Sequence, residues 1–288
     1  MKLALGTAQF GLHYGIANQD GQVTRPTAKA MLQLAAATGI NTLDTAIAYG
    51  ESETCLGEVG IRGFKLVTKL PAVPDGCTDV PTWVNQQVHA SLSRLCTDRL
   101  YGLLLHRPEQ LLGKSGQVLY QALCSLKSQG LVEKIGISIY APDELGALCH
   151  YYTFDLIQAP FNVLDHRMID TGWLTCLYGR GVEVHVRSVF LQGLLLMPPT
   201  QRPASFARWQ SLLHSWDQWL AEHQLTPVQA CLQHALSFPE IAQVVVGLDS
   251  MAQLQEVIMN AEGVLPPLPP TLHTNDIDLL NPARWERI

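Results

Sequence analysis

The sequence predicts an α/β protein, a (β/α)8 or TIM barrel that forms a single domain from residue 1 to residue 288. Short apolar runs rich in β-formers alternate with longer helical patterns along nearly the whole chain, which is typical of parallel sheet built from βα units. Eight such runs occur, and several are apolar throughout, as expected for strands buried on both faces. A barrel of eight units runs to roughly 250 residues, so the chain length suits one domain. A doubly wound open sheet stays open as an alternative because it gives the same alternation.

The predicted strands are 3–9, 41–46, 65–70, 100–106, 134–140, 155–162, 182–190 and 242–248. The predicted helices are 26–38, 80–95, 117–128, 143–152, 168–178, 207–223, 227–237 and 251–261. The helix at 227–237 has a clear start, because Thr226 suits an N-cap and Pro227 suits the first turn. After the proline-rich stretch 266–270, we expect the tail 262–288 to pack back on the barrel, since Leu279, Leu280 and Trp285 are too apolar for a free end.

The composition excludes several classes of partner. Hydrophobic residues make up 47% of the chain and charged residues 15%, which favours a full core over disorder. A net charge of −6 disfavours a nucleic-acid surface and favours a small-molecule partner. Neither a signal peptide nor an apolar run of about 18 residues is visible, so we expect a cytoplasmic protein that does not interact with membranes. Seven cysteines without CxxC spacing indicate neither a disulfide framework nor a metal site.

Polar residues follow three successive apolar strands at their C-terminal ends. Asp44 ends the second predicted strand, Lys69 the third and His106 the fourth, while Tyr49 lies in the loop after Asp44. The C-terminal ends of barrel strands face one mouth, so these four side chains can converge there. Taken singly, each residue has an ordinary alternative role. Asp44 could cap a helix and Lys69 could be a surface charge, while His106 could be a buried imidazole and Tyr49 a loop aromatic. Together they are harder to explain structurally, because a Lys and a His at the ends of apolar strands cost desolvation energy.

These four residue types suit the reduction of a carbonyl group. The reaction needs a hydride donor and a proton donor, and a phenol with an ordinary pKa near 10 is a poor acid unless a neighbouring ammonium favours its anion. We therefore expect Tyr49 to act as the general acid and Lys69 to supply the ammonium. Asp44 would hold Lys69 charged and oriented, and His106 would hydrogen-bond the substrate oxygen.

The motifs LDTAIAYGESE, KLVTKL and LLLHRPE, in that order, resemble those of the aldo-keto reductase family. The resemblance implies an NAD(P)(H)-dependent oxidoreductase that reduces an aldehyde or ketone to an alcohol, or catalyses the reverse, with the four residues above as its tetrad. GISIYAPDEL and LIQAPFNVLD resemble the family's strand-five and strand-six motifs. They imply that Ser138 and Gln158 hold the nicotinamide amide, with Asn162 as a neighbouring candidate; for Ser138 a capping hydroxyl is the alternative.

The segment VRSVFLQGLL resembles a family segment that often reads Tyr-Ser-Pro-Leu, and it implies cofactor contacts for Arg187 and Ser188. Arg187 stands where an aromatic side chain usually stacks on the nicotinamide. A guanidinium can stack on a ring and also pair with an anion, so we expect Arg187 to contact cofactor or substrate. The alternative is an arginine bound to a carboxylate elsewhere in the mouth.

The last motif, VVVGLDSMAQLQEVIMNAE, resembles the family segment that binds the adenosine end of the cofactor. Members that prefer NADP carry Lys or Arg there, whereas this chain has Gly247 and Gln253, and no Lys or Arg between Arg208 and Arg284. The missing cations favour NAD(H). The family habit favours NADP(H), so the choice stays open here. Glu256 can accept hydrogen bonds from adenine or ribose, although a solvated carboxylate is the simpler explanation.

The substrate is less well defined by the sequence. Arg107, Arg167, Arg187 and His13 are placed near the predicted mouth and suggest a small carbonyl compound that is anionic or sugar-like, although surface arginines are the simpler account of the first two. Two other functions stay open. One is a barrel lyase or aldolase in which Lys69 forms a Schiff base, which a nearby Asp44 disfavours. The other is a cofactor-binding regulatory subunit with little turnover.

Overall fold

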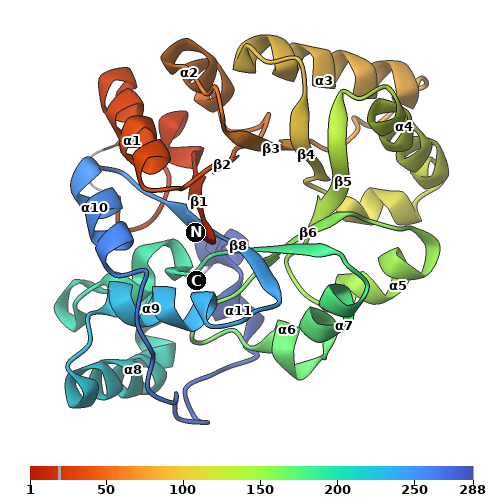
Figure 1. The fold of residues 1–288 in the computed structure, drawn as a ribbon. Helices are drawn as coiled ribbons and strands as arrows, with labels where there is room; N and C mark the ends of the chain where they lie inside the picture. Colours follow the sequence, from red (N-terminus) through yellow and green to blue (C-terminus); the bar gives the residue numbers. More distant parts are fainter. Residues whose placement is uncertain (19–20, 288) are drawn as a thin grey trace.

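The computed structural model describes residues 1–18 and 21–287 and shows a closed barrel of eight parallel strands (Figure 1). The strands are β1 (Leu3–Gly6), β2 (Thr42–Asp44), β3 (Lys65–Leu70), β4 (Leu100–Leu105), β5 (Val132–Ser138), β6 (Leu156–Pro160), β7 (Glu183–Arg187) and β8 (Ile241–Gly247). β1 pairs in parallel with both β2 and β8, which closes the sheet on itself. The predicted TIM barrel is thereby confirmed, and an open sheet is excluded.

Helices surround the ring of strands (Figure 1). They are α1 (Arg25–Ala37), α2 (Ser52–Val59), α3 (Val80–Leu95), α4 (Gly116–Ser128), α5 (Asp143–Tyr151), α6 (Arg167–Asp170), α7 (Trp173–Gly179), α8 (Gln210–His223), α9 (Pro227–Leu236), α10 (Met251–Met259) and α11 (Ile277–Leu280). The predicted cap of α9 is confirmed, since the Thr226 side chain accepts a hydrogen bond from the Gln229 N–H and Pro227 stands in the first turn. In the described part of the chain, no helix is long and apolar enough to cross a membrane.

Several predicted boundaries differ from the structure for local reasons. The helix predicted at 168–178 is two helices, because Gly172 adopts a left-handed conformation with φ of 73° between α6 and α7. The first strand ends at Gly6 instead of residue 9, since Ala8–Phe10 forms a 3-10 turn. The short helix α2 is not predicted by the local sequence pattern. This short helix is held by tertiary contacts, because buried Glu53 accepts hydrogen bonds from Thr68, Ser91 and Arg94.

The barrel interior is apolar in the middle and polar at its N-terminal end. Val67, Leu104 and Leu156 are fully buried and pack together inside the ring. Towards the N-terminal ends of the strands, Glu183 accepts hydrogen bonds from the Tyr101 hydroxyl and the Lys134 ammonium. These contacts fill that end of the barrel and leave the C-terminal mouth for a site.

The tail after α10 lies against the barrel through both apolar and aromatic contacts. Leu279 and Leu280 of α11 are buried. Three histidine rings stack in a column where the tail meets the barrel. His273 lies 5.4 Å from His166, and His166 lies 5.3 Å from His234, measured between ring centroids. Ile288, the last residue of the predicted tail, is outside the described residues.

Candidate active site

A pocket of about 710 Å³ opens at the C-terminal mouth of the barrel. This volume falls within the range of roughly 300–1,000 Å³ that is usual for small-molecule and cofactor sites. Ten of the twelve predicted site residues line the pocket: Asp44, Tyr49, Lys69, His106, Ser138, Arg187, Ser188, Gly247, Gln253 and Glu256. The structure thus brings together residues that are 212 positions apart in the sequence, from Asp44 to Glu256. Gln158 and Asn162 lie outside the lining.

Asp44 and Lys69 form a buried ion pair at the bottom of the pocket. The Lys69 ammonium donates to Asp44 Oδ1 at 2.6 Å and to the Thr45 carbonyl at 3.0 Å. The Lys69 and Asp44 residues are 1% and 4% exposed. Burial alone would lower the pKa of Lys69, but the Asp44 carboxylate, helped by Tyr49, raises it above its ordinary value. Lys69 therefore stays an ammonium at neutral pH.

Tyr49 lies directly beside this ion pair, in the turn between β2 and α2. The Lys69 Nζ is 5.1 Å from the centroid of the Tyr49 ring. The turn requires glycine at position 50, because φ there is +55° and a Cβ would lie 2.5 Å from the Gly11 carbonyl oxygen. Ser52, at the start of α2, donates from its hydroxyl to the Thr7 carbonyl at 2.7 Å. These contacts fix the loop that carries the phenol.

His106 follows β4 on the other side of Tyr49. The two ring centroids are 6.1 Å apart and the rings are edge to face, with an interplanar angle of 83°. Burial and the positive charges of Lys69 and Arg187 lower the pKa of His106 to about 4. At neutral pH the imidazole is therefore uncharged and carries one N–H donor.

Gln158 and Ser138 form a hydrogen-bonded chain that ends on Asp44. The Gln158 amide nitrogen donates to Asp44 Oδ2 at 2.7 Å, and its oxygen accepts from the Ser138 hydroxyl at 3.4 Å. Both carboxylate oxygens of Asp44 are thus occupied, one by Lys69 and one by Gln158. Gln158 is fully buried and holds Asp44 from below, whereas Ser138 reaches the pocket.

Asn162 is engaged with backbone groups beneath the mouth. Its amide nitrogen donates to the Ser188 carbonyl at 3.2 Å, and its oxygen accepts from the N–H groups of Leu164 and Asp165. These bonds tie the loop after β6 to the loop after β7. Asn162 therefore supports Ser188 from behind.

Arg187, at the end of β7, is held by partners that leave its charge unneutralised. Its guanidinium donates to the Ile139 carbonyl at 2.9 Å and to the Ser188 hydroxyl at 3.2 Å, and it lies 4.8 Å from the centroid of the Tyr140 ring. Among the side chains that the structure describes, residues 1–18 and 21–285, Arg187 forms no ion pair with a carboxylate. The alternative of an arginine bound to a carboxylate elsewhere in the mouth is thus not what the described chain shows.

The other side of the pocket is formed by β8 and the start of α10. Gly247 is packed against Gln9, because a Cβ at position 247 would lie 2.7 Å from the Gln9 amide nitrogen. The side-chain oxygen of Gln9 is buried without a hydrogen-bond partner among the described residues. Gln253 accepts from the Asp249 N–H at 2.8 Å, and Glu256 follows one turn later on α10. This side of the lining contains two carboxylates, Asp249 and Glu256, and the lining as described has no Lys or Arg there.

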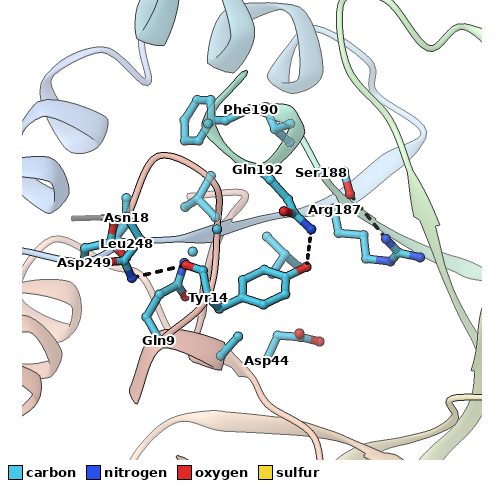
Figure 2. Close-up of a pocket in the computed structure, with 18 of the residues that line it drawn as sticks. Gln9, Tyr14, Asn18, Asp44, Arg187, Ser188, Phe190, Gln192, Leu248 and Asp249 are labelled. Carbon is cyan, nitrogen blue, oxygen red and sulfur yellow. Dashed lines mark hydrogen bonds between the residues drawn. The ribbon is translucent and has the colours of Figure 1, made fainter. Parts of the chain in front are cut away.

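Several lining residues were not singled out by the sequence. Figure 2 shows Tyr14 crossing the pocket, with its hydroxyl accepting a hydrogen bond from the Gln192 amide at 3.2 Å. Asn18 donates to Asp249 at 3.1 Å on the other side (Figure 2). The loop after β1 therefore bridges to the loops after β7 and β8. His13, the residue of this loop expected near the mouth, is exposed and outside the described lining, whereas its neighbour Tyr14 lines the pocket.

The arginines predicted near the mouth have different surroundings. Arg107 is exposed and outside the lining. Arg167 was placed near the mouth, with a surface arginine as the simpler account. That account is wrong, because Arg167 is 9% exposed and pairs with Asp165 at 2.7 Å, outside the described pocket lining. Among these arginines, Arg187 alone lines the pocket in the described chain.

Comparison with models of protein families identifies the family of this chain. The family model described as "Aldo/keto reductase family" matches residues 2–267. The chain belongs to the aldo/keto reductase family. The resemblance expected from the motifs is thereby confirmed, and family membership together with oxidoreductase relatives supports carbonyl oxidoreduction.

Two curated proteins are similar to this aldo/keto reductase over most of its length. The uncharacterized oxidoreductase YqkF of Bacillus subtilis (strain 168) is 25% identical over 282 residues, covering 90% of each chain. The L-galactose dehydrogenase of Arabidopsis thaliana is 28% identical over 266 residues, covering 82% of this chain and 78% of that protein.

Solved aldo-keto reductase structures share the fold. The holo form of the aldo-keto reductase AKR11C1 from Bacillus halodurans has a TM-score of 0.73 at 22% identity and covers 98% of this chain and 95% of its own. The glycerol dehydrogenase AKR11B4 from Gluconobacter oxydans has a TM-score of 0.67 at 19% identity and covers 92% and 88%. At these identities the likeness establishes the (β/α)8 fold.

Proposed function

We propose that this protein is an NAD(P)(H)-dependent carbonyl reductase that converts an aldehyde or ketone to an alcohol, or catalyses the reverse, with Tyr49 as the general acid. The observation that carries the proposal is the buried Asp44–Lys69 ion pair beside the Tyr49 ring, at the bottom of a pocket large enough for a cofactor. A charged ammonium next to a phenol favours the phenolate that remains when the proton is given up.

In this proposal each residue of the tetrad has one task. Tyr49 donates its proton to the carbonyl oxygen, and Lys69 stabilises the resulting phenolate. Asp44 keeps Lys69 charged and in place through the 2.6 Å hydrogen bond. Neutral His106 donates its N–H to the carbonyl oxygen and so orients the substrate. In the reverse direction Tyr49 takes the proton back from the alcohol.

The pocket fits a dinucleotide in its polar lining as well as in its volume. When bound, NAD(P)H supplies a hydride to the carbonyl carbon. Ser138, Arg187 and Ser188 would hold the nicotinamide end, and Gly247, Gln253 and Glu256 the adenosine end. The unpartnered buried oxygen of Gln9, beside Gly247, supports a ligand there, because a buried polar atom calls for a partner.

We propose NAD(H) as the preferred cofactor. Asp249 and Glu256 line the adenosine side of the pocket, where a 2′-phosphate would need Lys or Arg. Arg284 of the tail, a possible substitute, pairs with Asp278 at 2.7 Å and is not part of the lining. The described lining on that side offers no Lys or Arg to a 2′-phosphate, and this disfavours NADP(H). A cytoplasmic location stays a prediction from the sequence.

The charge of Lys69 argues against the lyase or aldolase alternative. A Schiff base forms from a neutral amine, whereas Asp44 raises the pKa of Lys69 and keeps it protonated. A regulatory subunit would share the pocket but not the turnover.

Steady-state assays separate these functions. We expect oxidation of NADH in the presence of small aldehydes such as 4-carboxybenzaldehyde, with lower kcat/KM for NADPH. Borohydride trapping should give no adduct on Lys69 when the protein is incubated with a ketone substrate. Binding of NADH without turnover of any aldehyde would support the regulatory subunit instead, and trapping on Lys69 would support the lyase.

A further inference from the structure

We propose that Arg187 and the hydroxyl of Tyr14 form an oxyanion-binding subsite beside the catalytic tetrad, so that the substrate is a carbonyl compound carrying a carboxylate or phosphate group. This inference rests on the proposed carbonyl reductase function and specifies its substrate class.

The described lining of the catalytic end contains a positive charge that no described carboxylate neutralises. The ammonium of Lys69 and the carboxylate of Asp44 cancel each other at 2.6 Å, and His106 is neutral at neutral pH. In the described pocket lining at this end, Arg187 is the remaining charged residue, and it makes its hydrogen bonds to the neutral oxygens of Ile139 and Ser188. Arg187 is a partly desolvated cation without a counter-ion among the described side chains, and such a cation favours an anionic ligand.

The guanidinium of Arg187 is fixed but keeps free donors. It has five N–H groups, of which two are used in the hydrogen bonds to Ile139 and Ser188. The guanidinium plane of Arg187 packs over the Tyr140 ring, 4.8 Å from its centroid. The side chain is therefore already ordered, and it loses little conformational entropy when an anion binds. The remaining N–H groups can serve the two oxygens of a carboxylate or phosphate.

Tyr14 adds a second donor to this subsite. Its hydroxyl oxygen accepts from the Gln192 amide, which leaves the hydroxyl proton free to donate to a ligand. Tyr14 is 43% exposed as a residue, but desolvation of its hydroxyl, helped by Tyr49, raises the pKa of Tyr14, so the phenol keeps that proton at neutral pH. Figure 2 shows the Tyr14 hydroxyl pointing towards the side of the pocket where Arg187 lies.

The position of Arg187 separates it from the adenosine side of the pocket. In Figure 2, Arg187 and Asp249 lie on opposite sides of Tyr14. Arg187 also acts on the catalytic end electrostatically, since it is among the charges that lower the pKa of His106. Its charge is therefore placed to recognise the substrate that His106 and Tyr49 would contact.

The test compares matched substrates in matched variants. The first pair is 4-carboxybenzaldehyde and its neutral methyl ester, and the second is glyceraldehyde 3-phosphate and glyceraldehyde, which distinguishes carboxylate from phosphate as the preferred anion. Each is assayed with the wild type, R187M, R187K and Y14F. R107M is the control, because Arg107 is an exposed arginine outside the pocket lining.

We expect the wild type to prefer the anion of at least one pair by about tenfold or more in kcat/KM, as a charge-assisted hydrogen bond predicts. R187M should abolish that preference, measured as the ratio of kcat/KM between the two members of a pair at saturating NADH, because it lowers kcat/KM for the anion more than for the neutral partner; R187K should restore part of the ratio. Y14F should weaken the preference, and R107M should keep it. A wild type without any preference would overturn the proposal, and so would an R187M variant that loses both members of a pair equally.

A binding experiment separates this proposal from the proposed function. The alcohols 4-(hydroxymethyl)benzoate and its methyl ester are titrated calorimetrically into protein saturated with NADH, where neither can be oxidised. Tighter binding of the carboxylate by wild type and equal binding of both by R187M would support the subsite even if no aldehyde were turned over. Equal binding of both compounds by the wild type would refute a carboxylate site there. Conversely, turnover without anion preference would refute the subsite and leave the reductase intact.

Discussion

Lys69→Met should destabilise the protein strongly, because it leaves the Asp44 carboxylate buried without its cation. Asp44 is 4% exposed, and after the change its remaining side-chain partner is the Gln158 amide at 2.7 Å. Removing one member of a buried ion pair costs about 3–5 kcal/mol, whereas removing both charges is often close to neutral. We therefore expect K69M to lose about 3–5 kcal/mol of unfolding free energy, and D44N/K69M to recover most of that loss.

The assay is urea unfolding at pH 7, followed by circular dichroism, with m-values compared between variants. The control is R99M, because Arg99 and Glu133 form a surface pair with side chains 70% and 45% exposed, for which we expect less than about 1 kcal/mol. The reasoning is refuted if K69M lies within about 1 kcal/mol of the wild type, or if the double variant is as unstable as K69M.

Three further predictions test the surroundings of the tetrad. Gln158→Leu removes the buried hydrogen bond to Asp44 and should cost about 1.5–3 kcal/mol in the same urea assay; an unchanged midpoint would mean that Gln158 does not hold the carboxylate. Burial, with His166 nearby, lowers the pKa of His234 to about 3, so the unfolded chain binds a proton that the folded protein rejects between pH 6.5 and about 3. Stability should therefore fall as the pH drops from 7 to 5, and His234→Leu should reduce that loss by up to about 2 kcal/mol; an equal pH dependence in the variant would contradict this. Gln253→Arg should tighten NADPH binding about tenfold in a fluorescence titration and leave NADH within about threefold, whereas unchanged NADPH affinity would show that position 253 does not face a 2′-phosphate.

The barrel fold and the convergence of the tetrad side chains at its C-terminal mouth were predictable from the sequence for the same physical reason. The strands are short, mainly apolar runs, and polar residues that stand at their C-terminal ends face one mouth. Asp44, Lys69 and His106 therefore converge from β2, β3 and β4 as expected, while their catalytic roles stay predictions. α2 was missed because its stability comes from the hydrogen bonds of buried Glu53 to other elements, which a local pattern does not show.

The details of the pocket depend on side-chain direction and loop path, which sequence patterns do not specify. The contact of Gln158 with the nicotinamide stays a prediction, whereas its hydrogen bond to Asp44, a residue 114 positions away, could not be predicted from the sequence. In the loop after β1, His13 and Tyr14 are adjacent, and only the folded loop shows that Tyr14 enters the pocket. The counter-ion of Arg167 is Asp165, two residues earlier, which the sequence alone did not distinguish from a solvated arginine.

The most direct test of the central claim is hydride transfer in Tyr49→Phe, measured in a single turnover after NADH-saturated protein is mixed with 4-carboxybenzaldehyde. The phenylalanine keeps the ring beside Lys69 and His106 but has no proton to give. We predict that the rate of NADH oxidation falls by about 10²–10⁴-fold, as expected for the loss of a general acid, while the NADH dissociation constant changes by less than about threefold. An unchanged rate with NADH still bound would contradict the assignment of Tyr49 as the acid.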